Sequence, residues 1–103
     1  MGIIESNLQK IFELCRRYRV KDLSVFGSIL TERFNDQSDV DLLVNFESYD
    51  PDSMEFDYVS NYFDLKDSLE KLFNRKVDLI EDGDQLNPLF REMVYQKKQL
   101  IYG

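Results

Sequence analysis

The sequence predicts a single α/β domain, on the evidence of its length, its composition and its patterning. A chain of 103 residues suits one small domain, and we treat residues 1–103 as one unit. Apolar residues make up 43% of the chain and include eight Phe and six Tyr, which is enough to form a core. Segments with apolar residues at helical spacing alternate with short segments in which apolar and polar residues alternate, as they do in strands.

The first helix is predicted from a capping box over residues 6–9, followed by apolar residues at helical spacing. It continues to about Arg19 and places Arg16, Arg17 and Arg19 in the last turn, where cations suit the helix dipole. Cys15 lies on the apolar stripe, so we expect a core residue and not a reactive thiol. A single cysteine forms no internal disulfide, which agrees with a reducing compartment.

Two further helices are predicted downstream. Residues 54–73 carry tyrosines and leucines at intervals of four and three, which is typical of a long amphipathic helix. Asn87-Pro88 provides a cap and a first-turn proline for a last helix that runs to about Lys98. A short helix or turn is expected over residues 29–34.

Strands are predicted between these helices. Residues 22–26, 40–46 and 76–80 alternate between two faces, and residues 40–46 give the clearest pattern. Residues 99–102 add a short strand or a docked tail. Polar loops are expected over residues 35–38, 48–53 and 81–85.

Charge and composition exclude several classes of function. The formal net charge is −7, from 20 acidic and 13 basic side chains, which disfavours a long nucleic-acid partner. The sequence contains no histidine, so Ser-His-Asp catalysis, Cys-His catalysis and His-ligated zinc are excluded. No membrane-spanning run and no signal peptide are recognisable, and we expect a cytoplasmic protein.

Two short motifs together suggest a phosphate and metal site. Gly27-Ser28 ends one predicted strand, and Asp39-Val40-Asp41 follows after ten residues. Gly27 lets a phosphate approach the backbone, and Ser28 offers a hydroxyl and an N–H group at the start of a helix. Asp39 and Asp41 lie on one face of an extended strand, with Cα atoms about 6.6 Å apart. Paired carboxylates select a hard cation, so Mg²⁺ or Mn²⁺ is the expected ion.

Each motif alone has a simpler explanation, since Gly-Ser is commonly a turn and Asp-x-Asp commonly the solvated face of a strand. Their combination favours the functional interpretation. Asp78 is the candidate third ligand, on the strand over residues 76–80. The alternative is an edge-strand carboxylate paired with Lys76 or Arg75.

On these residues the sequence resembles the minimal (MNT-type) nucleotidyltransferases of the DNA polymerase β-like superfamily. Gly27-Ser28, Asp39-Val40-Asp41 and Asp78 match each element of the hallmark, and the resemblance extends over nearly the whole chain. It implies an α/β fold with a small mixed sheet flanked by helices, like the polymerase β palm. It also implies that such a protein acts as the antitoxin of a HEPN-type RNase toxin, in a hetero-oligomer, by transferring AMP from ATP to a toxin tyrosine.

The resemblance also assigns roles to residues. It implies that Asp39, Asp41 and Asp78 bind metal and carry the catalysis, with Asp78 helping to activate the acceptor. Gly27 and Ser28 are implied to hold the triphosphate, and Ser38 is a further nucleotide-binding candidate.

One departure from the family pattern keeps an alternative open. Many relatives carry a small residue, Arg and Gly where this chain has Leu30-Thr31-Glu32, although Arg33 follows directly. The alternative is therefore an antitoxin that neutralises its partner by binding alone. A third possibility, a small-molecule transferase, is disfavoured because no second domain is available to enclose a small acceptor.

The acceptor surface is expected to come from a partner chain. Four aromatic residues near the start of the long helix either form a patch for that partner or face the core. They are Phe56, Tyr58, Tyr62 and Phe63.

Overall fold

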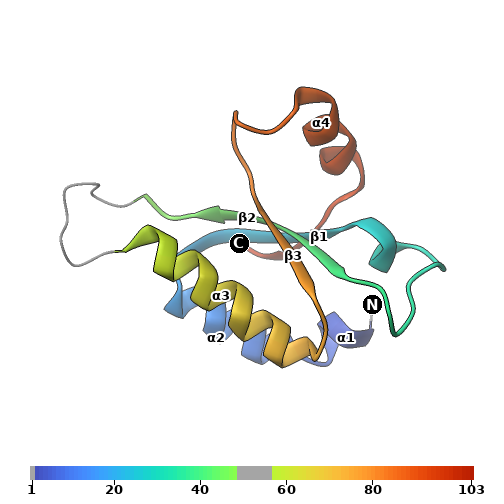
Figure 1. Ribbon diagram of the computed structural model, residues 1–103, viewed down its shortest axis with the longest axis horizontal. Helices are drawn as coiled ribbons and strands as arrows, with labels where there is room; N and C mark the ends of the chain where they lie inside the picture. Colours follow the sequence, from blue (N-terminus) through green and yellow to red (C-terminus); the bar gives the residue numbers. More distant parts are fainter. Residues whose placement is uncertain (1, 49–56) are drawn as a thin grey trace.

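The computed structural model describes residues 2–48 and 57–103. In these residues four strands form one sheet, and helices flank it (Figure 1). The strands lie in the order β3-β2-β1-β4. The elements in chain order are α1 (Gly2–Glu5), α2 (Leu8–Arg17), β1 (Val20–Phe26), the 3₁₀ turn η1 (Gly27–Leu30), β2 (Val40–Phe46), α3 (Tyr58–Phe73), β3 (Val77–Glu81), α4 (Pro88–Lys97) and β4 (Gln99–Tyr102).

The sheet is mixed, as the resemblance implied. β1 pairs antiparallel with both β2 and β4, whereas β2 and β3 are parallel. The parallel pair is connected through α3, a crossover that a tight turn could not make. β3 and β4 are the edge strands, and β2, which carries Asp41, is central.

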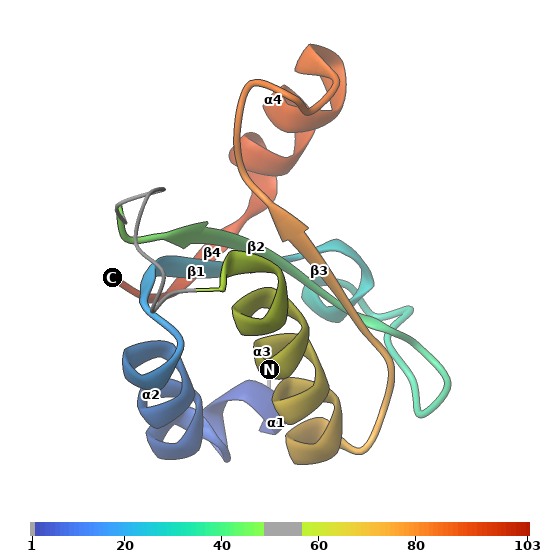
Figure 2. The same ribbon diagram turned by 60° about the vertical axis from the view of Figure 1, so that its left-hand side comes forward.

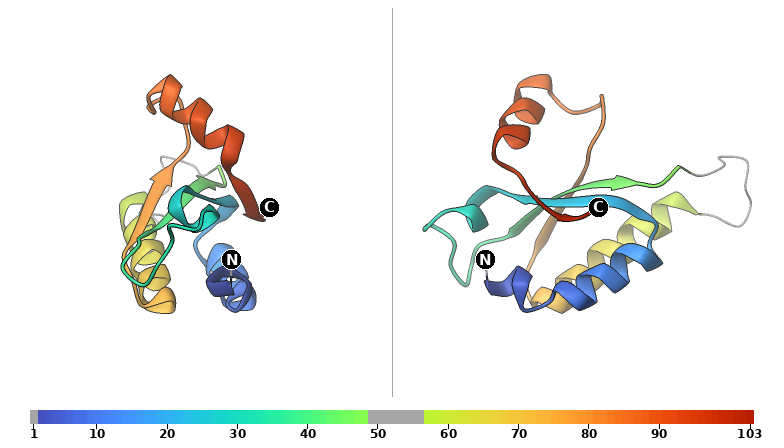
Figure 3. Two further views of the ribbon diagram at one scale, coloured as in Figure 1. Left: turned by 90° about the vertical axis from the view of Figure 1, so that its right-hand side faces the viewer. Right: turned by 180° about the vertical axis from the view of Figure 1, so that it is seen from behind.

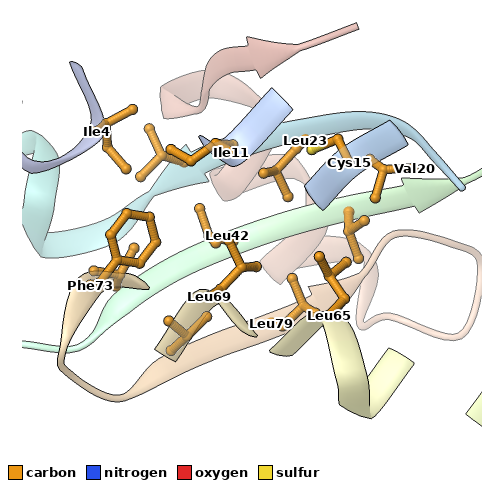
Figure 4. Close-up of a cluster of buried hydrophobic side chains, with 14 of the residues drawn as sticks. Ile4, Ile11, Cys15, Val20, Leu23, Leu42, Leu65, Leu69, Phe73 and Leu79 are labelled. Atoms are coloured by element: carbon orange, nitrogen blue, oxygen red, sulfur yellow. The ribbon is translucent and has the colours of Figure 1, made fainter. Parts of the chain in front are cut away.

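One face of the sheet is covered by α1, α2 and α3, and this side contains the main core (Figures 2 and 4). Leu65 and Leu69 of α3 and Ile11 of α2 pack onto Leu42 and its neighbours, and all four side chains are fully buried. Cys15 belongs to this core, and burial raises the pKa of its thiol to about 12. The prediction that Cys15 is a core residue is therefore confirmed.

The opposite face is covered only in part. α4 stands away from the sheet on this side (Figures 1 and 3) and buries one residue, Val94, against Phe26 and Leu43. Of the longer helices in the described residues, α4 is the one on this side, and the short 3₁₀ turn η1 continues from the end of β1 (Figure 3). In the described parts of the chain, no helix combines the length and apolarity required to cross a membrane.

The predicted capping box at Ser6 is wrong. The chain first forms the short helix α1, and the backbone N–H of Ser6 donates to the Gly2 carbonyl at 2.9 Å. Asn7 is instead the residue before α2, and its side chain donates back to Ile3 O at 2.8 Å. Local hydrogen bonding to the preceding turn thus replaces the cap.

The end of α2 and the start of α3 also differ from prediction. α2 ends at Arg17, and Arg19 adopts a left-handed conformation with φ 59°, which turns the chain into β1 two residues earlier than expected. α3 begins after Asp57, whose side chain accepts a hydrogen bond from the Ser60 N–H. Residues 54–56, predicted as helix, lie outside the described residues.

The aromatic residues of α3 divide between the two expected roles. Tyr62 packs against the core, and Tyr58 makes an edge-on contact with Phe46 at 5.5 Å between ring centroids. Phe63 is exposed. Phe56 lies outside the described residues. The rings of α3 therefore serve mainly to seal the helix onto the sheet.

Replacing Leu69 with alanine should lower the free energy of unfolding by about 2–5 kcal/mol, because the fully buried side chain leaves a cavity. Leu89→Ala is the matched control, since Leu89 is 72% exposed and its loss should change stability by no more than about 0.5 kcal/mol. Urea unfolding followed by circular dichroism measures both. Equal effects of the two substitutions would contradict the assignment of the core.

Candidate functional site

The Gly27-Ser28 turn directly follows β1 and lies against the carboxylate of Asp41. Phe26 pairs with Asp41 across the antiparallel ladder, so Gly27 emerges beside it. Gly27 has φ 81°, a conformation that side chains disfavour, and a Cβ there would overlap Asp41 Oδ2. Only glycine fits both conditions, and the backbone and carboxylate can share one small site.

Thr31, at the position where the sequence departs from the family pattern, makes local hydrogen bonds within the turn. Its backbone N–H and its hydroxyl both donate to Ser28 O, at 2.9 and 2.8 Å, and close the η1 turn. Its Oγ1 also accepts from the Arg33 N–H at 3.2 Å. Threonine therefore shapes the turn from within.

The three aspartates share the face of the sheet opposite the main core. Asp41 and Asp78 are register partners on the parallel strands β2 and β3, which lie about 4.8 Å apart as neighbouring strands do. Asp39 precedes β2 by one residue and Asp41 by two, so it projects to the same side. The predicted convergence of strands far apart in sequence is thus present at the level of the backbone.

Electrostatics link the same three residues. The pKa of Asp41 is raised, first by burial and then by repulsion from Asp78 and Asp39. The ionised form of Asp41 is therefore destabilised in the folded protein, and a bound cation would stabilise it. Perturbed carboxylates of this kind are common at functional sites.

The side chains do not form a ready-made metal cage. Among residues 2–48 and 57–103, no three or more acidic, histidine or cysteine side chains are gathered closely enough to hold a metal ion. The donor set still fits Mg²⁺ or Mn²⁺ in chemistry, because all the candidate ligands are carboxylate oxygens on one face. Gathering them requires a positive charge, since like charges repel.

Asp78 is exposed on the edge strand β3, between the buried residues Val77 and Leu79. Neither of the ion pairs in the described ranges, Lys71–Asp67 and Arg91–Asp82, includes it. Arg75, one of the partners considered from the sequence, is directed elsewhere, to the carbonyls of Asn35 and Ser38.

Ser38 helps to close the loop that leads to Asp39. Its Oγ accepts from the Asn35 N–H at 3.1 Å, and its own N–H donates to Asn35 O at 3.0 Å. Its role in nucleotide binding stays a prediction, because the hydroxyl serves the loop in this structure.

Sequence reasoning missed a polar cluster at the far end of the same face. Asp82 is only 8% exposed; Arg91 Nε donates to it at 2.8 Å, and Tyr95 and Asn45 also donate to it. Burial alone would raise the pKa of Asp82, but these hydrogen bonds outweigh burial and lower it. This cluster ties α4 to the sheet. An arginine nine residues after an aspartate offered little signal, because the intervening loop could take many shapes.

A second missed feature lies at the edge beside Asp78. The hydroxyl of Tyr62 donates to the Leu79 carbonyl, and Tyr58 donates to Glu81. Burial raises the pKa of Tyr62, with further contributions from Asp78 and Glu81. The two tyrosines therefore fasten α3 to the edge strand that carries Asp78.

Comparison with known proteins identifies the family. A sequence model described as Polymerase beta, Nucleotidyltransferase matches residues 9–103. The chain belongs to this family. The resemblance inferred from Gly27-Ser28 and the three aspartates is therefore confirmed, and the protein is a nucleotidyltransferase by family.

Relatives with known names are close in length to this nucleotidyltransferase. A candidate protein adenylyltransferase of Methanocaldococcus jannaschii is 35% identical over 89 residues, which cover 86% of this chain and 82% of the relative. The protein adenylyltransferase MntA of Thermococcus cleftensis is 32% identical over 87 residues, covering 81% of each chain.

Solved structures share the fold. A candidate minimal nucleotidyltransferase superimposes with a TM-score of 0.73 at 29% identity, covering 96% of this chain and 95% of the other. A complex of the tri-AMPylated HEPN toxin of Shewanella oneidensis with its MNT antitoxin matches with a TM-score of 0.65 at 19% identity. That match covers 97% of this chain and 72% of the other, and supports the fold only.

Gly27→Ala should greatly weaken binding of a nucleoside triphosphate, because the new Cβ overlaps the Asp41 carboxylate and strains the left-handed turn. The strain alone costs about 1–2 kcal/mol. Gly83→Ala is the control, since a Cβ there meets only the end of the flexible Gln85 side chain. Calorimetric titration with a non-hydrolysable ATP analogue and Mg²⁺ compares the two variants. Unchanged binding by Gly27→Ala would contradict the proximity of turn and carboxylate to the ligand.

Asp41→Asn should raise the melting temperature in the presence of a chelator. The pKa of Asp41 is raised in the folded state, so the charged form destabilises the fold above that pKa, and a neutral amide removes both burial of charge and repulsion. The gain should shrink toward acid pH, where the wild-type carboxyl is itself protonated. Thermal unfolding at pH 4 and pH 8 tests this, and a lower melting temperature at pH 8 would refute it.

Proposed function

We propose that this nucleotidyltransferase transfers AMP from ATP to a hydroxyl of a partner protein and acts as the antitoxin of a HEPN-type toxin. The observation that carries the proposal is the register of Asp41 and Asp78 beside the Gly27 turn. Relatives named as protein adenylyltransferases support the choice of reaction. The S. oneidensis complex, in which an MNT antitoxin of the same fold is bound to a HEPN toxin, motivates the choice of partner.

In the proposed site, Asp39, Asp41 and Asp78 hold Mg²⁺, or Mn²⁺ in its place. The ion supplies Lewis-acid stabilisation of the charge that develops on the phosphates. The residues fit this role because the charge on Asp41 is already disfavoured, first by burial and then by its acidic neighbours. Gly27 and the start of η1 offer backbone N–H groups to the triphosphate, with Ser28 adding its hydroxyl.

The transfer step is a nucleophilic substitution at the α-phosphorus of ATP. The acceptor oxygen bonds to the α-phosphorus, the bond to the β-phosphate oxygen breaks, and pyrophosphate leaves. We assign Asp78 to accept the acceptor's proton, because it lies exposed on the edge strand beside Asp41, which is half-buried. Asp41, which is less accessible, is better placed to face the nucleotide.

The acceptor must approach from the face that carries α4. The other face is covered by α1, α2 and α3 (Figure 2), whereas on the site face α4 stands away from the sheet (Figure 3). Phe90 of α4 contacts Phe26, the residue before Gly27, at 6.1 Å between ring centroids. Leu89 and Met93 on the same helix are 72% and 67% exposed. A protein acceptor could cover such apolar surface; a small one could not.

Binding without transfer is the second candidate. The observation that favours it is the Thr31 turn, in which a hydroxyl closes η1 at the position where relatives carry arginine. The exposed apolar side chains of α4 would serve this function equally well. The two candidates differ in whether the acidic residues are needed.

The deciding experiment combines the purified protein with ATP, Mg²⁺ and the HEPN-type protein encoded beside it. Mass spectrometry should show the partner gaining the mass of one or more AMP groups. Asp41→Asn should abolish the gain, and Asp78→Asn should slow it on the order of 10²–10⁴-fold, the usual contribution of a positioned base.

Asp84→Asn serves as the matched control, because Asp84 is an exposed carboxylate in the loop before α4. It should transfer AMP at the wild-type rate. If no adduct forms, while Asp41→Asn still protects cells from the toxin, the transfer proposal fails and neutralisation by binding takes its place.

A further inference from the structure

We infer that Arg75 is a positioning residue of the nucleotidyl-transfer site, which fixes the loop before Asp39 to the start of the strand that carries Asp78. The inference rests on the proposed function, because it assumes that these two carboxylates act together. It concerns a residue that touches neither the nucleotide nor the metal.

The contacts of Arg75 span two segments far apart in the chain. Its Nη1 donates to Asn35 O at 2.9 Å and to Ser38 O at 3.0 Å. The guanidinium carbon lies 4.7 Å from the ring centroid of Phe34. One planar cation thus holds both ends of the loop over residues 35–38 and stacks on the residue that precedes it.

The positions of these contacts matter for the site. Ser38 directly precedes Asp39, and Arg75 precedes Asp78 by three residues. Just after Ser38 and Arg75 in the chain, Val40 N donates to Lys76 O at 3.1 Å. This bond begins the parallel pairing of β2 and β3. A shift of the loop at Ser38 would move the carboxylate of Asp39 relative to Asp78.

The loop depends on such a tether, because in the described parts of the chain its other hydrogen bonds stay within residues 33–38. Asn35 and Ser38 bond to each other through Ser38 Oγ and Asn35 O, and Gln37 N donates to Asn35 Oδ1 at 2.8 Å. These bonds fix the shape of the loop but not its place on the sheet. Arg75 supplies that placement from the turn after α3, where Asn74 adopts φ 52°.

Lysine cannot reproduce this arrangement. A guanidinium is flat enough to stack on Phe34 while its N–H groups reach two carbonyls, whereas an ammonium is a compact, strongly hydrated charge. The side chain is also set into the structure, since Arg75 Nε is buried. Arg75→Lys therefore keeps the positive charge but loses the stacking on Phe34 and the paired hydrogen bonds to the two carbonyls.

The test measures metal binding as well as turnover. We expect Arg75→Met and Arg75→Lys to weaken Mn²⁺ binding about 10–100-fold in the presence of a non-hydrolysable ATP analogue, as the loss of groups that orient metal ligands does. Mn²⁺ binding is measured by electron paramagnetic resonance. In both variants kcat should fall and the KM for ATP should rise. Lys76→Met, which removes the adjacent exposed cation, should leave all three values unchanged.

Hydrogen exchange separates positioning from general stability. In Arg75→Lys the Ser38 amide should exchange faster, whereas the amides of Leu42 and Val44 in β2 should keep their protection. If Arg75→Met fails to fold, Arg75→Lys carries the test alone. The inference would be overturned if the Mn²⁺ affinity and kcat of Arg75→Lys were within twofold of those of Lys76→Met.

Failure of the proposed function would look different. In that case Asp39→Asn and Asp41→Asn would bind Mn²⁺ and the ATP analogue as wild type does. If those variants lose binding and Arg75→Lys does not, the proposed function stands and only the role of Arg75 is refuted.

Discussion

Repulsion between carboxylates on neighbouring parallel strands is the constraint on which the rest of this structure depends. Asp41 and Asp78 are register partners, so the ladder itself keeps them side by side. Burial disfavours the charge on Asp41, and the proximity of Asp78 disfavours it further. A fold tolerates such an arrangement when other packing is strong enough to hold the strands together, and it gains a site that a divalent cation can neutralise.

The required packing comes from the other face of the same strands. Val40, Leu42 and Val44 alternate along β2 with Asp41, Leu43 and Asn45, and are fully buried under α2 and α3. A one-residue slip of β2 would bury Asp41 in the core and expose leucine, so the apolar pattern also fixes the position of the site. Core and site are two consequences of one period-two pattern.

This pattern explains how much could be predicted. Every strand was found within two residues of its place, and the shared face of Asp39 and Asp41 followed from alternation alone. The capping box at Ser6 was wrong because α1 intervened, which depends on local hydrogen bonds to Ile3 and Gly2. The roles of Arg75 and Asp82 could not be predicted, because their partners are fixed only after the chain has folded.

The two faces of the sheet differ in how firmly their helices are held, and this asymmetry bears on how an acceptor enters. α2 and α3 contribute several fully buried side chains, whereas α4 buries Val94 alone. The ion pair between Arg91 and Asp82 adds little by itself where Arg91 is partly exposed, and the hydrogen bonds to the buried Asp82 add more. α4 is therefore held less firmly than α2 and α3, and it lies on the face that carries the three aspartates. A partner that covered its exposed leucine and methionine would enclose the site and stabilise α4 by the same contact.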